Sequence, residues 1–427
     1  MSKNNFFKLR ILVFAIMVIV ACTPTANEKL IVTQEPVMTE KPTEEPILTK
    51  ESDLEIDLDC TISLWHSLNE DEFESLEEVL TIFQEAYPDI QFDVLFVPFD
   101  DMERKFETSA GNGGGPTILI GSGYWGPEFS DSLLIADVSE FTSNEFLDSI
   151  SQAALDTVKY KGGLLGLPLN LRGVLMFRNS SIIPEAPATL SALIAAAQAA
   201  TNGDIVGSYL EYGLFFSAGH LHGLGGQLLD ANGNPTFNNE KGLEWIEMIQ
   251  KFGEVGPIEN NTDNDVSLFQ EGRAGIIIDG LWNAVNFSEA IGPENLVIDP
   301  WPADMSGYVQ TDFIYLNANS TGGDLECGWK LMEFMFSPEA QALFSDPSMA
   351  GYIPTIVDAE VTDPIQRQAL VAFAGGTAFP VIPEMGAYWD PVNNALLAVI
   401  EQDTDPAEAL QAAHDVVVAK IAEIRGE

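Results

Sequence analysis

The first regular hydrophobic pattern of the chain begins at position 60. Apolar and polar residues alternate in 60–66, which indicates a strand with one buried face. Apolar positions then recur at spacings of three, four, three and four: Phe73, Leu76, Leu80, Phe83 and Tyr87. This spacing predicts an amphipathic helix, which Pro88 ends. Strict alternation in 90–97 predicts a second strand.

A polar helix through 102–110 and a strand at 117–120 extend the pattern to a β-α-β-α-β order. This order implies a parallel sheet with right-handed crossovers. A glycine-rich run at 111–115 lies between these two elements. Phosphate-binding loops follow a strand, open a helix and end in Gly-Lys-Ser/Thr. Because the run precedes a strand and lacks that ending, we interpret it as a mobile connection.

An apolar run without charge at 11–21 follows Lys3, Lys8 and Arg10 and ends at Cys22. This layout is typical of a secretory signal, and the run is too short to span ~30 Å of hydrocarbon. Ile-Val-Ala-Cys at 19–22 also resembles a bacterial lipobox, where the signal peptidase cuts before a lipidated cysteine. We predict a signal peptide at 1–21 and a lipid on Cys22. An ordinary signal peptide with a chance cysteine is the alternative.

The segment after Cys22 has the composition of a tether. Residues 23–59 contain no Phe, Trp or Tyr and carry four prolines among Thr and Glu. Such a segment cannot bury enough apolar area to offset its ordering entropy. We expect a lipid-anchored linker at 22–59 with a reach of roughly 30–35 Å.

Acidic residues dominate the charge, with 65 Asp and Glu against 19 Lys and Arg and a net charge of −46. Nucleic acid binding is excluded as a function class because phosphate neutralisation needs clustered Lys and Arg. Adsorption to anionic lipid is disfavoured for the same reason, so membrane attachment would be covalent. The 46% apolar content is ordinary for a globular protein, and the length beyond position 60 favours two domains.

Three cysteines are present, and Cys22 is assigned to lipid. Cys60 and Cys327 remain, which is compatible with one disulfide in an oxidising compartment. No Cys-x-x-Cys or His-x-x-x-His spacing suggests a metal site. His220 and His222 are two positions apart, which suits one strand face or a loop. We predict neither a metal nor a cofactor.

Four motifs resemble the extracellular solute-binding proteins of ABC importers, in the carbohydrate-binding branch typified by maltose-binding protein. They are 166–179 (GLPLN followed by GVLMFRN), 269–282 (FQEGRAGIIIDGLW), 337–341 (SPEAQ) and 382–389 (IPEMGAYW). The first resembles the family's first lobe crossing and the strand after it. The third resembles a helix start, in which Ser337 is the cap and Pro338 the first helical residue. The last resembles the segment that presents a stacking aromatic.

The resemblance implies an α/β fold of the type II periplasmic-binding-protein kind, with two discontinuous lobes, a hinge and an interlobe cleft. Lobe one would hold 60–165 plus 303–358, and lobe two 166–302 plus 359–427. The resemblance also suggests a disulfide between Cys60, which starts the first strand, and Cys327. Cys327 starts a helix after the returning strand, 312–318, of the same lobe. Both cysteines should lie on the face away from the cleft.

Sugar sites need aromatic platforms and a few oriented polar groups. Candidates at strand ends or in loops are Trp65, His66, Tyr124, Trp125, Trp282, Tyr388 and Trp389. Trp282 and Trp389 match family positions that stack on sugar rings, and Phe215 lies where the second lobe would add a wall. Burial in a lobe core is the alternative for each. Trp245 and Trp329 fall within helical stretches and are assigned to the core.

Three polar positions bear on specificity. Arg172 stands where the maltose-type protein has an acidic ligand contact, and Asn393 replaces an arginine there. These departures argue against maltodextrin itself. An arginine in a cleft can pair with a carboxylate or donate to vicinal hydroxyls, and an interlobe salt bridge is the alternative. Asp279 either accepts bonds from ligand hydroxyls or caps its turn.

The predicted function is that of a non-enzymatic lipoprotein on the extracytoplasmic face of the membrane. It would capture a sugar or oligosaccharide by lobe closure and deliver it, as a monomer, to an ABC permease. One alternative is a secreted carbohydrate-active hydrolase or lyase, which needs opposed carboxylates about 5–10 Å apart. Another is the same fold with a polyamine, peptide or metal chelate. A polyamine site would need carboxylates facing the cleft between aromatics, and Arg172 argues against it.

Overall fold

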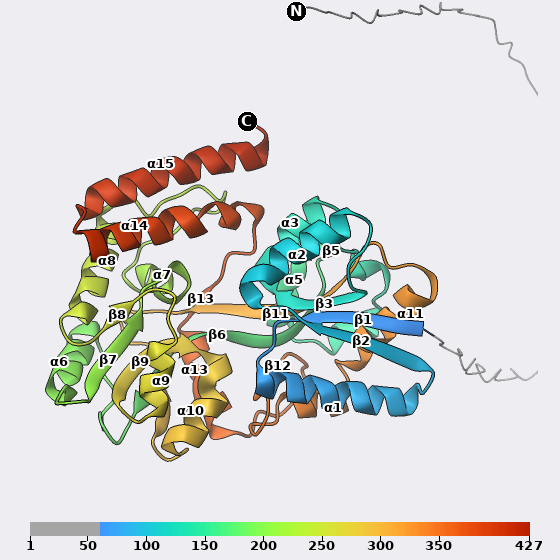
Figure 1. Ribbon diagram of the computed structural model, residues 1–427, viewed down its shortest axis with the longest axis horizontal. Helices are drawn as coiled ribbons and strands as arrows, with labels where there is room; N and C mark the ends of the chain where they lie inside the picture. Colours follow the sequence, from blue (N-terminus) through green and yellow to red (C-terminus); the bar gives the residue numbers. More distant parts are fainter. Residues whose placement is uncertain (1–59) are drawn as a thin grey trace, which may run out of the picture. The chain divides into compact units, whose positions relative to one another are not determined.

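The computed structural model describes residues 60–427, so the predicted signal peptide, the linker and the lipidated Cys22 lie outside the described residues. The described residues form a mixed α/β structure on an eleven-stranded sheet, with helices on both of its faces (Figure 1). The predicted α/β class is confirmed. None of the helices in residues 60–427 is both long and apolar enough to span a membrane.

The amino-terminal elements appear in the predicted order. They are β1 (Cys60–His66), α1 (Glu70–Ala86), β2 (Ile90–Phe96), α2 (Phe99–Gly111) and β3 (Ile118–Ser122). β1 pairs in parallel with both β2 and β3, which confirms the predicted parallel sheet. A capping box starts α1, since Asn69 Oδ1 accepts from the Glu72 N–H (2.9 Å) and Glu72 Oε2 accepts from the Asn69 N–H (3.0 Å).

The later strands complete the sheet and add a small hairpin of β4 and β5. They are β4 (Lys159–Tyr160), β5 (Gly163–Leu164), β6 (Leu167–Asn179), β7 (Val206–Glu211), β8 (Ile258–Glu259), β9 (Ala274–Gly280), β10 (Leu296–Asp299), β11 (Tyr308–Leu316), β12 (Ile353–Pro354) and β13 (Thr377–Ala378). Neighbouring strands along the main sheet follow the order β2-β1-β3-β11-β6-β9-β7-β8.

Helices cover this sheet along its length (Figure 1). The α-helices are α3 (Gly126–Asp131), α4 (Asn144–Asp148), α5 (Gln152–Val158), α6 (Leu190–Ala200), α7 (Leu214–Gly223), α8 (Glu240–Gly253), α9 (Asn264–Gln270), α10 (Ala284–Ile291), α11 (Gly322–Phe334), α12 (Pro338–Phe344), α13 (Pro364–Ala374), α14 (Trp389–Gln402) and α15 (Pro406–Arg425). Short 3-10 turns are η1 (Gly123–Trp125), η2 (Val138–Glu140), η3 (Leu281–Asn283) and η4 (Pro383–Ala387).

The long strand β6 joins two parts of the sheet. Its residues 167–173 pair with β11, which in turn pairs with β3. Its residues 174–178 pair with β9, which is parallel to β7. In Figure 1, β6 and β11 run side by side between the group of β1–β3 and the group of β7–β9.

Three buried apolar clusters form the interior. The first core draws on 62–169 and 313–356. The second core draws on 174–308 and 379–421, and the third on 175–298 and 353–373. Each core therefore combines segments that lie far apart in the sequence, and β6 contributes to all three cores.

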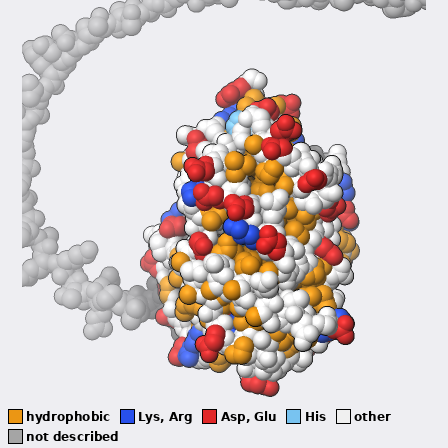
Figure 2. Space-filling model, turned by 90° about the vertical axis from the view of Figure 1, so that its left-hand side faces the viewer, with side chains coloured by type: hydrophobic (Ala, Val, Ile, Leu, Met, Phe, Trp, Pro, Cys, Tyr) orange, Lys and Arg blue, Asp and Glu red, His pale blue; other side chains and the backbone are white. Residues whose placement is uncertain are grey.

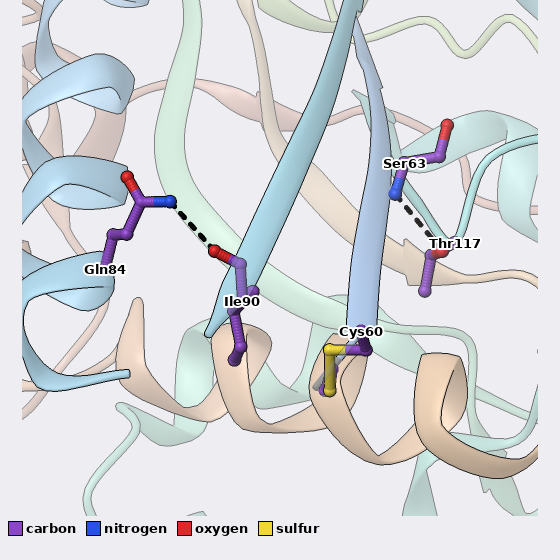
Figure 3. Close-up of a disulfide and its surroundings, with 6 residues drawn as sticks. Cys60, Ser63, Gln84, Ile90 and Thr117 are labelled. Carbon is purple, nitrogen blue, oxygen red and sulfur yellow. Dashed lines mark hydrogen bonds between the residues drawn. A yellow bond between two sulfur atoms is a disulfide. The ribbon is translucent and has the colours of Figure 1, made fainter. Parts of the chain in front are cut away.

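A disulfide joins Cys60 to Cys327, as the resemblance suggests, and it links the start of β1 to α11 (Figure 3). Two hydrogen bonds lie nearby in the same view. Gln84 Nε2 donates to the Ile90 carbonyl (2.8 Å), and the Ser63 N–H donates to Thr117 Oγ1 (3.3 Å). The amino ends of β1 and β2 are thus bound to the helices beside them.

Three local predictions can be compared with the structure. Ser337 caps α12, because its Oγ accepts from the Ala340 N–H (3.2 Å) with Pro338 as first helical residue, as predicted. Trp245 is fully buried in α8, also as predicted. The strand or loop expected at His220 is wrong, because this histidine lies in α7. Most of α7 is buried, so its sequence carries no polar stripe that marks a helix.

The surface reflects the acidic composition. Figure 2 shows the side of the molecule that carries α6 and α8, where acidic side chains are spread widely with few basic ones between them. Such a surface repels polyanions.

Candidate functional site

The turn after β9 presents Trp282. Asp279 accepts from the Gly280 N–H (2.6 Å) and from Asn283 Nδ2 (2.7 Å), so it caps the turn that carries the indole. A Cβ on Gly280 would overlap the Trp282 ring, so only glycine lets the ring fold back over the strand end. Burial, and then the charge of Asp265, raise the pKa of Asp279 to about 7. Of the two roles considered for Asp279, the structure shows the turn cap.

Trp282 belongs to a continuous aromatic surface made of Tyr124, Phe215, Trp282, Phe379 and Trp389. Ring centroids are 6.1 Å apart for Trp282 and Phe215, and 5.8 Å for Phe215 and Phe379. Phe379 stacks on Trp389 at 5.8 Å, and Trp389 lies 5.4 Å from Tyr124. All except Phe379 are partly exposed. The structure therefore brings four sequence candidates together.

This aromatic surface lies where the first and second cores meet. Tyr124 follows β3 and packs against both cores. Phe215 and Trp389 pack against the second core from α7 and α14. Carboxyl ends of strands in open α/β sheets are the usual place for ligands, and both β3 and β9 end here. Partly exposed rings gathered at such a place can stack on flat apolar faces of a ligand.

Arg172, on β6, lies at one end of the aromatic surface, with its guanidinium 4.6 Å from the Trp282 ring centroid. It forms an ion pair and a hydrogen bond with Asp312, and Glu72 Oε1 lies 3.6 Å from its Nη1. The side chains of Arg172, Glu72 and Asp312 are 17%, 5% and 6% exposed. Burial lowers the pKa of Arg172, but the two carboxylates outweigh it and raise the pKa. Arg172 therefore stays charged.

A cavity of about 230 Å³ lies beside the other end of the aromatic surface, against Tyr124 and Trp389. Glu103 and Glu107 of α2 and Glu128 of α3 also line it, together with Arg104, which pairs with Asp101 (2.9 Å). Burial, then Glu107 and Glu128, raise the pKa of Glu103 to about 7. Burial and Glu128 likewise raise the pKa of Glu107. The cavity thus combines aromatic faces with carboxylates that gain from a proton or a cationic partner.

Four sequence candidates lie outside the aromatic surface. Trp125 and Tyr388 are 1% and 0% exposed, and Tyr388 Oη donates to the Gly233 carbonyl (2.8 Å). Both are core residues and offer no face to a ligand. His66 is 2% exposed, stacks on Phe73 at 4.5 Å and has its pKa lowered to about 4 by burial. Trp65 packs against the first core with Lys105 Nζ 5.0 Å from its ring centroid.

Asn393 contributes to the site through the backbone. Its Oδ1 accepts from the Leu214 N–H (2.8 Å) at the first residue of α7. Gly213 precedes α7 and has no side chain to do this. Asn393 therefore caps the helix that carries Phe215, and in this structure it is a support of the aromatic surface.

Sequence reasoning missed Phe379 and the three carboxylates of the cavity. Phe379 meets the criterion applied to the other rings, since it lies in a loop just after β13. Glu103 and Glu107 are four residues apart on α2, a spacing that places both on one helix face. Nothing local indicates that Glu128 joins them. Among residues 60–427, no group of His, Cys, Asp and Glu is arranged to hold a metal ion.

Comparison with known proteins decides the family. Residues 78–373 match the family described as bacterial extracellular solute-binding protein, which covers more than half of the chain. The chain belongs to this family. This solute-binding protein is 23% identical to the maltotriose-binding protein of Pyrococcus abyssi, covering 82% of this chain and 78% of that one. It is 24% identical to the galactooligosaccharide-binding protein of Bacillus subtilis, over 81% and 86% of the two chains.

Solved structures support the predicted fold class of two lobes. The maltose/maltodextrin-binding domain MalE from Bdellovibrio bacteriovorus, bound to maltotriose, superposes with a TM-score of 0.77 at 22% identity. It covers 84% of this solute-binding protein and 99% of its own chain. The maltotriose-binding protein of Thermus thermophilus, also bound with maltotriose, gives a TM-score of 0.76 at 21% identity over 84% and 100% of the chains.

Proposed function

We propose that this solute-binding protein captures a sugar or oligosaccharide between two lobes and delivers it to an ABC permease. The single observation that carries the proposal is the aromatic surface, whose partly exposed rings come from both sides of the junction between the first and second cores. Stacked rings suit the flat C–H faces of sugars. The names of the relatives, which bind maltotriose or galactooligosaccharide, support the same solute class.

The proposed lobes keep the bounds predicted from the sequence, 60–165 plus 303–358 and 166–302 plus 359–427. The first core supports lobe one, and the second and third cores support lobe two. The exceptions lie near the borders: Leu167 and Leu169 of the first core fall within lobe two, and Met305, Tyr308 and Ile353 of the other two cores fall within lobe one. Contacts that exist only when both lobes touch the solute would drive closure. We further propose that the protein acts as a monomer, held on the extracytoplasmic face by a lipid on Cys22.

Substitution of the stacking rings tests the proposal. Trp282→Ala and Trp389→Ala should each weaken binding of the solute at least tenfold in calorimetry, because ring stacking is worth about 1–3 kcal/mol in related cases. Trp329→Phe is the matched control, since Trp329 packs against Phe141 and Phe146 in the first core. A thermal-shift screen against maltotriose, galactooligosaccharides and other sugars would supply the solute. Unchanged affinity in both alanine variants would reject the rings as platforms.

A cationic solute is the second candidate, and the carboxylate cavity favours it. Three carboxylates beside Tyr124 and Trp389 form the arrangement expected for a polyamine or an amine-bearing sugar. The one cation among the described lining residues, Arg104, is already paired with Asp101. The ion pairs of Arg172 with Asp312 and Glu72 weaken the argument against such a solute. Including spermidine and glucosamine oligomers in the screen decides between the candidates. A stabilisation by spermidine and none by neutral sugars would replace the leading proposal.

The proposal also states that the protein is not an enzyme, and all the curated relatives named above are binding proteins. Glu103, with its pKa raised to about 7 by burial and by neighbouring carboxylates, has the electrostatic setting of a general acid. Product release from oligosaccharides at pH 5–7 therefore needs to be measured. Turnover that Glu103→Gln abolishes would establish a hydrolase and overturn the binding role.

A further inference from the structure

Arg172 stands at the point where β6 passes from the first core to the second. Up to Leu169, β6 contributes to the first core, and from Val174 it contributes to the second. The carboxylates that pair with Arg172 both belong to elements on the first side. Glu72 lies in the first turn of α1, and Asp312 lies in the part of β11 that pairs with β3.

One corner of the guanidinium, Nη1, is paired by the protein itself, whereas Arg172 Nε is buried and makes no hydrogen bond within the described residues. Asp312 and Glu72 provide two carboxylates against one positive charge. Asn170 Nδ2 donates to Asp312 (3.2 Å), and Asn170 Oδ1 accepts from the Asp312 N–H (3.1 Å), so this carboxylate is fixed in place. A further carboxylate brought by a solute would be repelled by both residues in a buried setting.

Trp282 is held from the same side by two contacts. Its ring lies against the Arg172 guanidinium, 4.6 Å from centroid to Cζ, and its carbonyl accepts from Asn69 Nδ2 (3.3 Å). Asn69 and Glu72 are the two members of the capping box that starts α1. One turn of α1 therefore acts on the Trp282 carbonyl directly and on the Trp282 ring through Arg172.

We propose that Arg172 is a positioning residue that fixes the Trp282 platform against α1, and that it does not bind an acidic solute. The inference rests on the proposed sugar-binding function and narrows its solute class to ligands without a carboxylate. Guanidinium is planar, so its face lies on the indole while Nη1 donates to Asp312 and stays near Glu72. Lysine keeps the charge but loses the plane, and methionine loses both.

The position of Trp282 can be measured without any solute. In 5-fluorotryptophan-labelled protein, the Trp282 fluorine resonance is assigned by its loss in Trp282→Phe. We expect Arg172→Met to shift and broaden this resonance and Arg172→Lys to shift it less. Arg178→Lys is the matched control, because Arg178 lies on the same strand and pairs with buried Asp299 (2.5 and 3.0 Å) away from Trp282. A wild-type Trp282 resonance in Arg172→Met would overturn the proposal.

Calorimetry with maltotriose and with trigalacturonate tests the solute class. Maltotriose affinity should fall about three- to tenfold in Arg172→Met and less in Arg172→Lys. Tight binding of trigalacturonate that Arg172→Met abolishes would make Arg172 a ligand contact and overturn the proposal. If neither sugar binds, these two sugars give no support to the proposed function, whereas the fluorine spectra of the free protein still decide the positioning role.

Arg172→Met needs a second variant beside it, because this substitution leaves the buried side chains of Glu72 and Asp312 without their cation. The double variant Arg172→Met/Glu72→Gln removes one of these charges and keeps the capping box, since glutamine can replace glutamate at that position. Its Trp282 resonance should be displaced in the same direction as in Arg172→Met. A return to the wild-type resonance in this double variant would count against Arg172 as the residue that holds the ring.

Discussion

Three carboxylates share the cavity beside Trp389, and burial together with the neighbouring carboxylates raises the pKa of Glu103 and of Glu107. Glu103 is the most affected, because burial and then Glu107 and Glu128 raise its pKa from 4.5 to about 7. The folded protein therefore binds more protons at Glu103 than the unfolded chain does between about pH 4.5 and pH 7. Stability contributed by this group is fully present below pH 4.5 and is lost as the pH rises through that window.

Replacement of Glu103 by glutamine should remove this loss. We expect Glu103→Gln to be more stable than the wild type at pH 8, by about 1–2 kcal/mol, and equal to it near pH 4. Urea unfolding of both proteins at several pH values measures the difference in stability. His66 and His220 have lowered pKa values and change stability with pH in the opposite sense to Glu103, but they do so equally in both proteins and therefore cancel in the difference. Glu77→Gln, at an exposed position of α1, is the control and should show no such difference. Equal stability of Glu103→Gln and wild type at pH 8 would contradict the prediction.

At the scale of elements, α7 depends on a residue from another helix for its first turn. The Leu214 N–H is bound by Asn393 of α14, and the next residue of α7 is Phe215 of the aromatic surface. Helix starts without a capping side chain leave backbone N–H groups unsatisfied. The contact between α14 and α7 therefore stabilises one helix and also sets the position of one ring of the aromatic surface.

Two substitutions separate this cap from a direct contact with the solute. Asn393→Ala should lower stability by about 1 kcal/mol and weaken solute binding several-fold through Phe215. Asn393→Asp keeps the acceptor but cannot donate to a ligand hydroxyl, so it should retain both stability and affinity. Thr189→Ala provides the control, since Thr189 caps α6 (3.1 Å to the Ala192 N–H) and should affect stability alone. Binding lost in Asn393→Asp would restore Asn393 as a ligand contact.

Across the whole molecule, the sequence patterns predicted most accurately those helices and strands that bury one face and expose the other. The β1, α1, β2, α2 and β3 elements follow from alternation or from spacings of three and four. Tyr124 and Trp125 could not be told apart, because the η1 turn decides which ring enters the core. Trp125 folds back over Gly121, where a side chain would overlap its ring, and Tyr124 stays partly exposed. Of the adjacent residues Tyr388 and Trp389, likewise, the first is buried in the core and the second is partly exposed.

The partners of Arg172 were also beyond prediction from the sequence. Glu72 has the spacing of a capping-box residue, and the cap of α1 alone accounts for a glutamate at this position. Its sequence context therefore gives no sign of the contact with Arg172. Asp312 lies within a strand whose neighbours are known only once β11 pairs with both β3 and β6. Three charged groups from α1, β6 and β11 meet only after the sheet has formed, so no local pattern contains them.

Closure of the two proposed lobes is a property of the whole molecule. Tyr124 packs against both cores, whereas Phe215 and Trp389 pack against the second, so a solute that stacks on all three rings gains contacts when the lobes approach. Spin labels on Glu140→Cys in η2 and Glu254→Cys after α8 would report the distance between the proposed lobes. Saturating solute should shorten this distance, and Trp389→Ala should need at least tenfold more solute for the same change. Solute binding with an unchanged distance would show a rigid site.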